Sequence, residues 1–104
     1  MIIRTAYWTG TLKPGVEDEF FDGVMLLKPR LEALPGVKSV YVKRPYEYEP
    51  ASWKQFCELS VVFDSKQDLA TMLASEGRAA VRAAFAELVP LFDGTIHHVN
   101  FETQ

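Results

Sequence analysis

His98 and Glu58 are the two residues of the chain that best fit acid/base chemistry. Histidine titrates near neutral pH, so His98 can accept or donate a proton under physiological conditions. Arg4 can hold an anionic or hydroxylated ligand while Glu58 tunes a proton beside it. Two alternatives stay open: His98 as a hydrogen-bonded residue at a subunit interface, and Arg4 with Glu58 as a buried ion pair. We therefore predict His98 and Glu58 as the candidate catalytic residues.

Ligand binding, as distinct from catalysis, is predicted for Arg4, Trp8, Tyr41 and Asn100. Trp8 and Tyr41 supply aromatic surface and Asn100 a polar group, which is the mixture that ligand pockets combine. The alternative is that both aromatic side chains pack in the core of a dimer. A closed pocket in which Arg4, Glu58 and His98 converge favours an enzyme. A pocket filled by Trp8, Tyr41 and Phe56 favours a binding protein without catalysis.

Neither a metal site nor a bound cofactor is expected. His97 and His98 are adjacent in a predicted strand, so their side chains point to opposite faces and cannot share one metal ion. A metal site also needs three or four ligands, and the sequence spaces no such cluster. No glycine-rich nucleotide loop is present. Haem remains an alternative, because His98 could supply its axial ligand. The one cysteine, Cys57, is predicted to be a buried, inert thiol.

Composition limits the class of protein. The chain has 104 residues, which predicts one domain over residues 1–104. A formal charge of -3 gives no basic face for phosphate contacts, so no nucleic-acid partner is expected. No apolar run is long enough to span a bilayer, so no membrane partner is expected. The first ten residues are too short and too polar for a signal peptide. With one cysteine, the default location is the cytoplasm.

Alternating and helical periodicities predict the order of the elements. Strands are predicted at 2–9, 37–44, 54–63 and 95–102, and helices at 16–34, 65–75 and 78–89. Ser65 can cap the second helix, and Pro29 predicts a kink or a break in the first one. The order β-α-β-β-α-β predicts an α+β, ferredoxin-like fold: a four-stranded antiparallel sheet with its helices on one face.

The faces of the strands follow from the period of two. In the third strand the apolar side is predicted to meet the helices, as are Ile3, Thr5 and Tyr7 of the first strand. The opposite, open face then carries a mixed set, namely Arg4, Trp8, Tyr41, Phe56, Glu58, Val62, Ile96, His98 and Asn100. Exposed apolar patches of this kind usually mark an interface. We therefore predict a homodimer joined through the sheet faces, with the candidate site between the two sheets.

Four segments of the chain resemble the EthD-like family of the dimeric α/β-barrel superfamily. They are KPGVEDEF at 13–20, LPGV at 34–37, ELSVVFDSKQDL at 58–69 and ASEGRAA at 74–80. The resemblance implies two ferredoxin-like subunits that form one eight-stranded barrel. EthD-like proteins usually carry a histidine two residues before the proline of the first helix, and Leu27 stands at that position. We expect Leu27 to pack as an apolar residue and to touch no ligand.

The resemblance implies relatives that act in the degradation of organic compounds, cofactor-independent monooxygenases, isomerases and haem-binding enzymes. The function expected for this chain is that of an EthD-like barrel protein that binds a small hydrophobic molecule, in an accessory role in the degradation or metabolism of organic compounds. The alternative is a cofactor-independent monooxygenase, lyase or isomerase that acts on a hydrophobic oxygenated or aromatic compound.

Overall fold

The computed structural model describes all residues from 1 to 104 and has the predicted order of elements. In chain order these are β1 (Ile2–Leu12), α1 (Glu17–Glu32), β2 (Ser39–Lys43), β3 (Gln55–Phe63), α2 (Lys66–Leu73), α3 (Glu76–Ala86), the 3-10 turn η1 (Val89–Leu91) and β4 (Phe92–Glu102). The four strands form one antiparallel sheet in the order β2-β3-β1-β4. The ferredoxin-like α+β prediction is confirmed.

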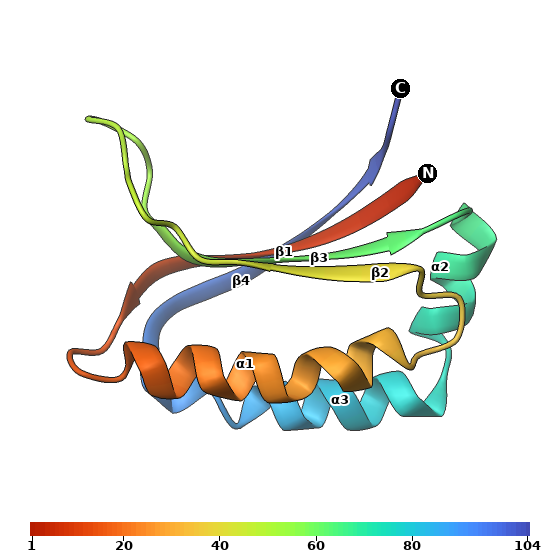
Figure 1. Ribbon diagram of the computed structural model, residues 1–104, viewed down its shortest axis with the longest axis horizontal. Helices are drawn as coiled ribbons and strands as arrows, with labels where there is room; N and C mark the ends of the chain where they lie inside the picture. The colour runs from red at the N-terminus through yellow and green to blue at the C-terminus, as the bar shows by residue number, and fades with distance from the viewer.

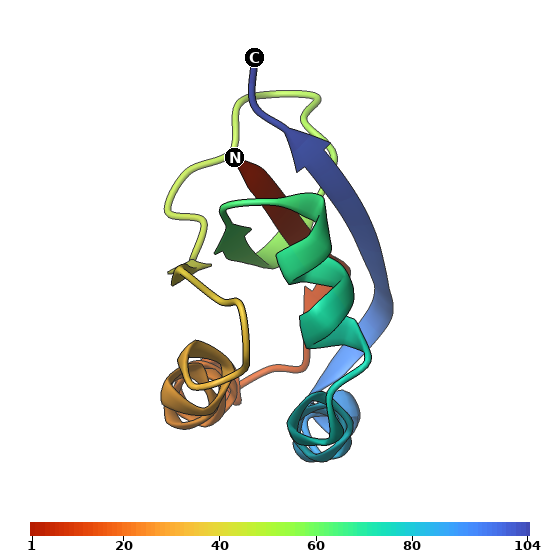
Figure 2. The same cartoon turned by 90° about the vertical axis from the view of Figure 1, so that its right-hand side faces the viewer.

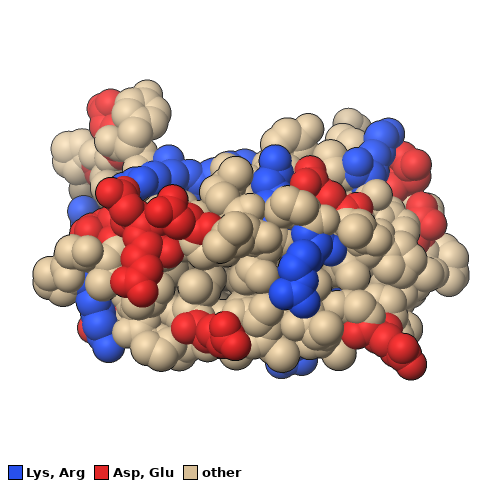
Figure 3. Space-filling view, turned by 60° about the horizontal axis from the view of Figure 1, so that its bottom comes forward, with Lys and Arg blue, Asp and Glu red and all other residues tan.

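The helices lie on one side of the sheet and leave the other side bare (Figure 1). Figure 2 shows α1 and α3 side by side below the sheet, and Figure 1 shows α2 at one end of the molecule. Seen from the helix side, the surface carries acidic and basic side chains interspersed among neutral ones (Figure 3). The two sides of the sheet are called the helix side and the open face from here on.

Two serine caps explain why the second helical segment is divided. The Oγ of Ser65 accepts a hydrogen bond from the backbone N–H of Asp68 at 3.1 Å, which confirms the predicted cap of α2. The Oγ of Ser75 accepts from the backbone N–H of Arg78 at 3.2 Å and starts α3. The new helix direction brings α3 alongside α1. The break lies at Ser75, one residue before the predicted Glu76–Gly77 position.

The predicted break of the first helix at Pro29 does not occur, because α1 runs unbroken from Glu17 to Glu32. Pro29 is exposed and lies in the last turns of the helix, where its missing N–H removes one hydrogen bond only. Its carbonyl oxygen still accepts a hydrogen bond from the N–H of Ala33 at 3.1 Å. The helix does not break because a proline near the end of a helix disturbs few later turns.

The core lies between α1 and the helix side of β3. Phe20, Val24, Cys57 and Phe63 have no measurable exposure. The ring of Phe20 packs edge-on against four other aromatic rings, with centroids 5.1 to 6.3 Å apart. Full burial of one such side chain contributes about 1.5–3 kcal/mol to folding. This cluster holds α1 against the sheet at the end opposite α2.

The pairing register corrects the predicted faces of β1 and β4. Arg4 pairs with Val61 and Trp8 pairs with Cys57, so Arg4 and Trp8 share the helix side of β3. His98 pairs with Ala6 of β1 and lies on the same side. The prediction that put Arg4, Trp8 and His98 on the open face is therefore wrong. Its cause is physical: both sides of β1 carry apolar groups, so alternation alone does not decide the face.

A β-bulge moves Phe56 off its predicted face. The register of β1 and β3 shifts after Trp8, where Thr9 pairs with Gln55 and leaves Phe56 as the extra residue. Phe56 then turns into the core, where its ring centroid lies 5.4 Å from that of Phe20. The predicted place of Phe56 on the open face is wrong because strict alternation does not hold across a bulge.

Candidate functional site

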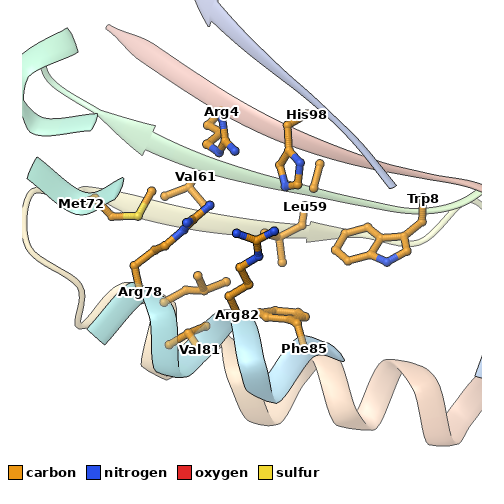
Figure 4. A pocket seen from close by; sticks show the side chains of 12 residues that line it. Arg4, Trp8, Leu59, Val61, Met72, Arg78, Val81, Arg82, Phe85 and His98 are labelled. Carbon is orange, nitrogen blue, oxygen red and sulfur yellow. The ribbon is translucent and has the colours of Figure 1, made fainter. Parts of the chain in front are cut away.

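A cavity of about 270 Å³ lies between the helix side of the sheet and helices α2 and α3 (Figure 4). We call it the α3 pocket. Eight of its twelve lining residues are hydrophobic. The other four are three arginines and one histidine: Arg4, Arg78, Arg82 and His98. The pocket is therefore an apolar cavity with a strongly cationic lining, and no carboxylate takes part in it.

Helix α3 supplies two of the cations. Arg78 and Arg82 are four residues apart, so they lie on one face of the helix, the face that also carries the buried Val81. Figure 4 shows both guanidinium groups extending from α3 toward the sheet. Arg78 is half-buried and Arg82 is exposed, so Arg82 lies nearer to solvent.

The sheet supplies the other two basic side chains. Arg4 on β1 and His98 on β4 extend toward α3 from above (Figure 4). The Nη1 atom of Arg4 donates a hydrogen bond to Oδ1 of Asn100 at 3.0 Å. Asn100 pairs directly with Arg4 across β1 and β4, so the sheet register itself sets this contact. Asn100 is thus a residue that positions Arg4.

Burial and mutual repulsion shift both sheet groups away from their charged forms. Desolvation, and then the charge of Arg78, lowers the pKa of Arg4. Desolvation also lowers the pKa of His98, and the charges of Arg4, Arg78 and Arg82 lower it further. The imidazole of His98 is therefore neutral at pH 7 and able to accept a proton. None of the ion pairs in the structure involves Arg4, Arg78 or Arg82.

The other end of the α3 pocket is aromatic. Trp8 is 4% exposed, and its ring centroid lies 6.2 Å from that of Phe85 on α3. Figure 4 shows these two rings at one end of the cavity, with Arg4 and Arg78 toward the other end. Leu59 and Val61 of β3 form part of the wall between them. A flat apolar group fits against such rings, and an anionic group fits against the guanidinium groups.

The structure divides the six predicted site residues between two faces. Arg4, Trp8 and His98 line the α3 pocket. Asn100 contacts Arg4 at its side. Tyr41 and Glu58 lie on the open face, where they border a different hollow. The predicted grouping of all six residues is wrong, because Glu58 precedes Leu59 in β3 and must point to the opposite side.

Glu58 has partners of its own on the open face. Its Oε1 atom accepts a hydrogen bond from Nζ of Lys43 at 3.1 Å, and its Oε2 atom accepts one from Nε2 of Gln55 at 3.0 Å. Glu58 forms no ion pair with Arg4, so the alternative of a buried Arg4–Glu58 pair is also wrong. The structure does not bring Glu58 and His98 together as an acid/base pair.

Sequence reasoning missed Arg78, Arg82 and Phe85. The spacing held a usable signal, since Arg78, Arg82 and Phe85 fall on the same helical face as the apolar Val81. Two basic residues on the buried side of an alanine-rich helix are unusual. Leu27 is half-buried and lines neither hollow, so it does not replace the family's histidine in a site.

The open face carries an apolar surface that includes the predicted Tyr41 and Val62 and adds members that were not predicted. Tyr41, Val99 and Phe101 are 55%, 42% and 43% exposed. Val99 pairs with Thr5 across β1 and β4. Tyr41 and Phe101 line a hollow together with Thr5 and Ser60, whose hydroxyl groups form a buried hydrogen bond of 2.9 Å. Ile96 pairs with Trp8 across β1 and β4, so it also lies on the helix side, and its predicted place on the open face is wrong.

The remaining candidate groups lie outside both hollows. Cys57 faces the helices as predicted, and burial raises the pKa of its thiol to about 12, so it stays protonated. His97 lies on the open-face side, contrary to prediction, with Nε2 2.9 Å from Oγ1 of Thr95. No three His, Cys, Asp or Glu residues are grouped to hold a metal ion. No helix has the length and apolarity needed to cross a bilayer.

Comparisons with known proteins identify the fold. No family model and no curated protein matches the chain. Among solved structures, an EthD family protein from Bacillus halodurans superposes with a TM-score of 0.76 at 12% identity, over 100% of both chains. A mutant of SnoaB, a cofactor-independent oxygenase from Streptomyces nogalater, superposes with a TM-score of 0.70 at 16% identity, over 99% of this chain and 92% of that one.

A third solved structure has the same fold. It is a dimeric protein of unknown function from Bacteroides fragilis, with a TM-score of 0.60 at 18% identity, over 98% of this chain and 96% of that one. The resemblance to EthD-like proteins is thus confirmed as a likeness of fold.

Proposed function

We propose that the protein binds a small organic molecule in the α3 pocket. The observation that carries this proposal is one cavity with aromatic rings at one end and unpaired cations at the other. Pockets for small ligands combine an apolar lining with a few placed polar groups, and they start near 300 Å³. The volume of about 270 Å³ fits a ligand with a small ring system. An accessory role in the metabolism of organic compounds is the function that such binding supports.

Isothermal titration calorimetry with a two-ring probe, 2-naphthamide or 2-naphthoate, tests this proposal. Val81→Phe fills the cavity, since Val81 lines it and is 4% exposed. Val89→Phe is the matched control at a position that is 50% exposed and outside the pocket. We expect Val81→Phe to abolish binding and Val89→Phe to leave it unchanged, with both folded by circular dichroism. Equal binding by the two variants would contradict the proposal.

A second candidate function is oxygenation without a bound cofactor, and the neutral His98 beside three arginines favours it. His98 would remove a proton from an acidic methylene group, and the arginines would stabilise the resulting enolate. Reaction of the enolate with dioxygen turns the methylene into a carbonyl group and releases the second oxygen atom as water. The substrate supplies all the electrons, so no further reductant is needed. Lyase and isomerase reactions could begin with the same proton removal.

Oxygen uptake with 2-tetralone, an aromatic ketone with an acidic methylene group, tests the second candidate. We expect uptake that falls about 100-fold or more in His98→Gln, which is the usual loss for a general base. His97→Gln is the control, because His97 lies on the other side of the sheet. Uptake that His98→Gln leaves unchanged would contradict the oxygenase function and leave the binding function in place.

We also propose a homodimer formed through the open face. The exposed apolar side chains there, the bare face of the sheet in Figure 1 and the dimeric neighbour of the same fold support it. Sedimentation velocity should find a dimer that Phe101→Asp dissociates. Leu26→Asp, at a position 77% exposed on α1, should leave it intact. Dissociation by Leu26→Asp alone would place the interface on the helices instead. The single buried Cys57 fits a reducing compartment, and we propose the cytoplasm.

A further inference from the structure

The α3 pocket gathers positive charge without any compensating group of the protein. Arg4, Arg78 and Arg82 line one cavity, and no Asp or Glu side chain is among its lining residues. The only hydrogen bond that the side chain of Arg4 makes is to the neutral amide of Asn100. Charged groups that leave water are costly unless they are paired. Arg4 and Arg78 are half-buried without an acidic partner, and Arg82 adds a third, exposed guanidinium group, so the pocket is complementary to an anion.

Two carboxylates of the sheet are paired with lysines outside the pocket. Glu102 at the end of β4 pairs with Lys66 of α2, with Oε2 3.6 Å from Nζ. Glu58 pairs with Lys43 on the open face. No Asp or Glu of the chain forms an ion pair with Arg4, Arg78 or Arg82.

The position of the cations relative to the rings fixes the shape of the partner. Arg4 and Arg78 lie toward one end of the cavity, and Trp8 with Phe85 lies at the other. Leu59 and Val61 of β3 form an apolar wall between the two ends, and Figure 4 shows Arg82 and His98 between them as well. A ligand that satisfies both ends has an anionic group at one end of a flat apolar body. A guanidinium group matches a carboxylate with two parallel hydrogen bonds, which favours that anion.

We infer that the ligand of the α3 pocket is an aromatic carboxylate, held at its carboxylate by Arg4, Arg78 and Arg82 and at its rings by Trp8 and Phe85. This inference rests on the proposed binding function and names its ligand class. Asn100 holds Arg4 in place for the contact. Because His98 is neutral at pH 7, the positive charge that binds the carboxylate comes from the three arginines.

Calorimetric titration at pH 7.5 with 2-naphthoate and its neutral amide, 2-naphthamide, separates charge from shape. The two probes share one ring system and differ in charge. We expect 2-naphthoate to bind about tenfold or more tightly than 2-naphthamide, as charged hydrogen bonds require. Arg78→Gln and Arg82→Gln should each weaken 2-naphthoate several-fold and leave 2-naphthamide unchanged. Arg30→Gln, an exposed residue of α1 outside the pocket, is the control for net charge and should change neither.

The outcomes separate this inference from the proposed function. Equal affinity for the two probes, with binding still lost in Val81→Phe, would overturn the carboxylate and keep the pocket as a binding site. Tighter binding of 1-naphthyl phosphate than of 2-naphthoate would also overturn it. Failure of both naphthyl probes to bind the folded wild type would contradict the inference and the proposed function together. If Arg30→Gln weakened the binding of 2-naphthoate as much as Arg78→Gln does, the effect would come from net charge alone and the inference would be overturned.

Discussion

The two sides of the sheet treat their polar groups in opposite ways. On the open face, Glu58 accepts hydrogen bonds from Lys43 and Gln55, and Thr5 and Ser60 bond to each other. On the helix side, the arginines of the α3 pocket face one another with no acid between them. Polar groups that are already hydrogen-bonded can be buried against another protein at little cost, whereas unpaired charges are stabilised by a ligand of opposite charge. The difference supports the proposed ligand binding on the helix side and the proposed dimer formation through the open face.

The largest expected effect is on the core that supports the helix side. Phe20→Ala should lower the free energy of unfolding by about 3–5 kcal/mol, because its ring is fully buried against four others. Leu26→Ala, on the exposed side of the same helix, should stay within about 0.5 kcal/mol of wild type. Urea unfolding measures both. Equal losses for the two variants would show that the face of α1 is misread.

Binding should respond to one side of the sheet only. Arg4→Gln should weaken 2-naphthoate about tenfold or more, since it removes a charged hydrogen-bond donor from the α3 pocket. Glu58→Gln, on the open face, should leave the affinity unchanged. Calorimetry on both variants gives the comparison. A larger loss in Glu58→Gln than in Arg4→Gln would move the binding site to the open face.

The hydroxyl pair of the open face should contribute less to the free energy of unfolding than Phe20 does. Thr5→Val leaves the Ser60 hydroxyl without its partner in a buried place and should cost about 1–3 kcal/mol of unfolding free energy. The double variant with Ser60→Ala should recover part of that loss, because both polar groups are then absent. The unfolding free energies of the two singles and the double decide this. Losses that simply add would show that the two hydroxyls do not interact.

The smallest expected effect is a pH dependence from His98. Its pKa is lowered in the folded protein, so between that pKa and the ordinary value of histidine only the unfolded chain binds the proton. His98 therefore does not change the free energy of unfolding above that ordinary value. As the pH drops below it, protonation of the unfolded chain lowers the free energy of unfolding. His98→Gln should flatten the decline in melting temperature between pH 7 and pH 5, and His97→Gln should not. An unchanged slope in His98→Gln would contradict the lowered pKa.

The sequence predicted the fold because the local signals agreed with one another. The alternating Cys57, Leu59, Val61 and Phe63 of β3, together with the serine cap at Ser65, leave little freedom in the order of elements. The helix pairing followed from that order. The register at the bulge beside Phe56 could not be predicted, because nothing in the local sequence marks the extra residue.

The site was predicted in part, and the error has one source. Arg4, Trp8, His98 and Asn100 were placed on one face together, and they do share one face. The face itself was assigned wrongly, because β1 carries Ile3 and Tyr7 on one side and Ala6 and Trp8 on the other. A slip of one residue exchanges the two sides. Because the predicted site lay on the wrong face, it included Glu58, which lies on the open face. For the same reason it did not include Arg78 and Arg82 of α3.

The two tryptophans offer the most direct measurement of the central claim, that the helix side binds the ligand. Trp8 lines the α3 pocket, whereas Trp53 lies in the β2–β3 loop and is 70% exposed. Two indole N–H signals are expected in a proton–nitrogen NMR spectrum, and Trp53→Phe assigns them. Addition of 2-naphthoate should shift the Trp8 signal and leave the Trp53 signal in place. A shift of the Trp53 signal alone, or a Trp8 signal that stays unmoved at saturating 2-naphthoate, would contradict binding in the α3 pocket.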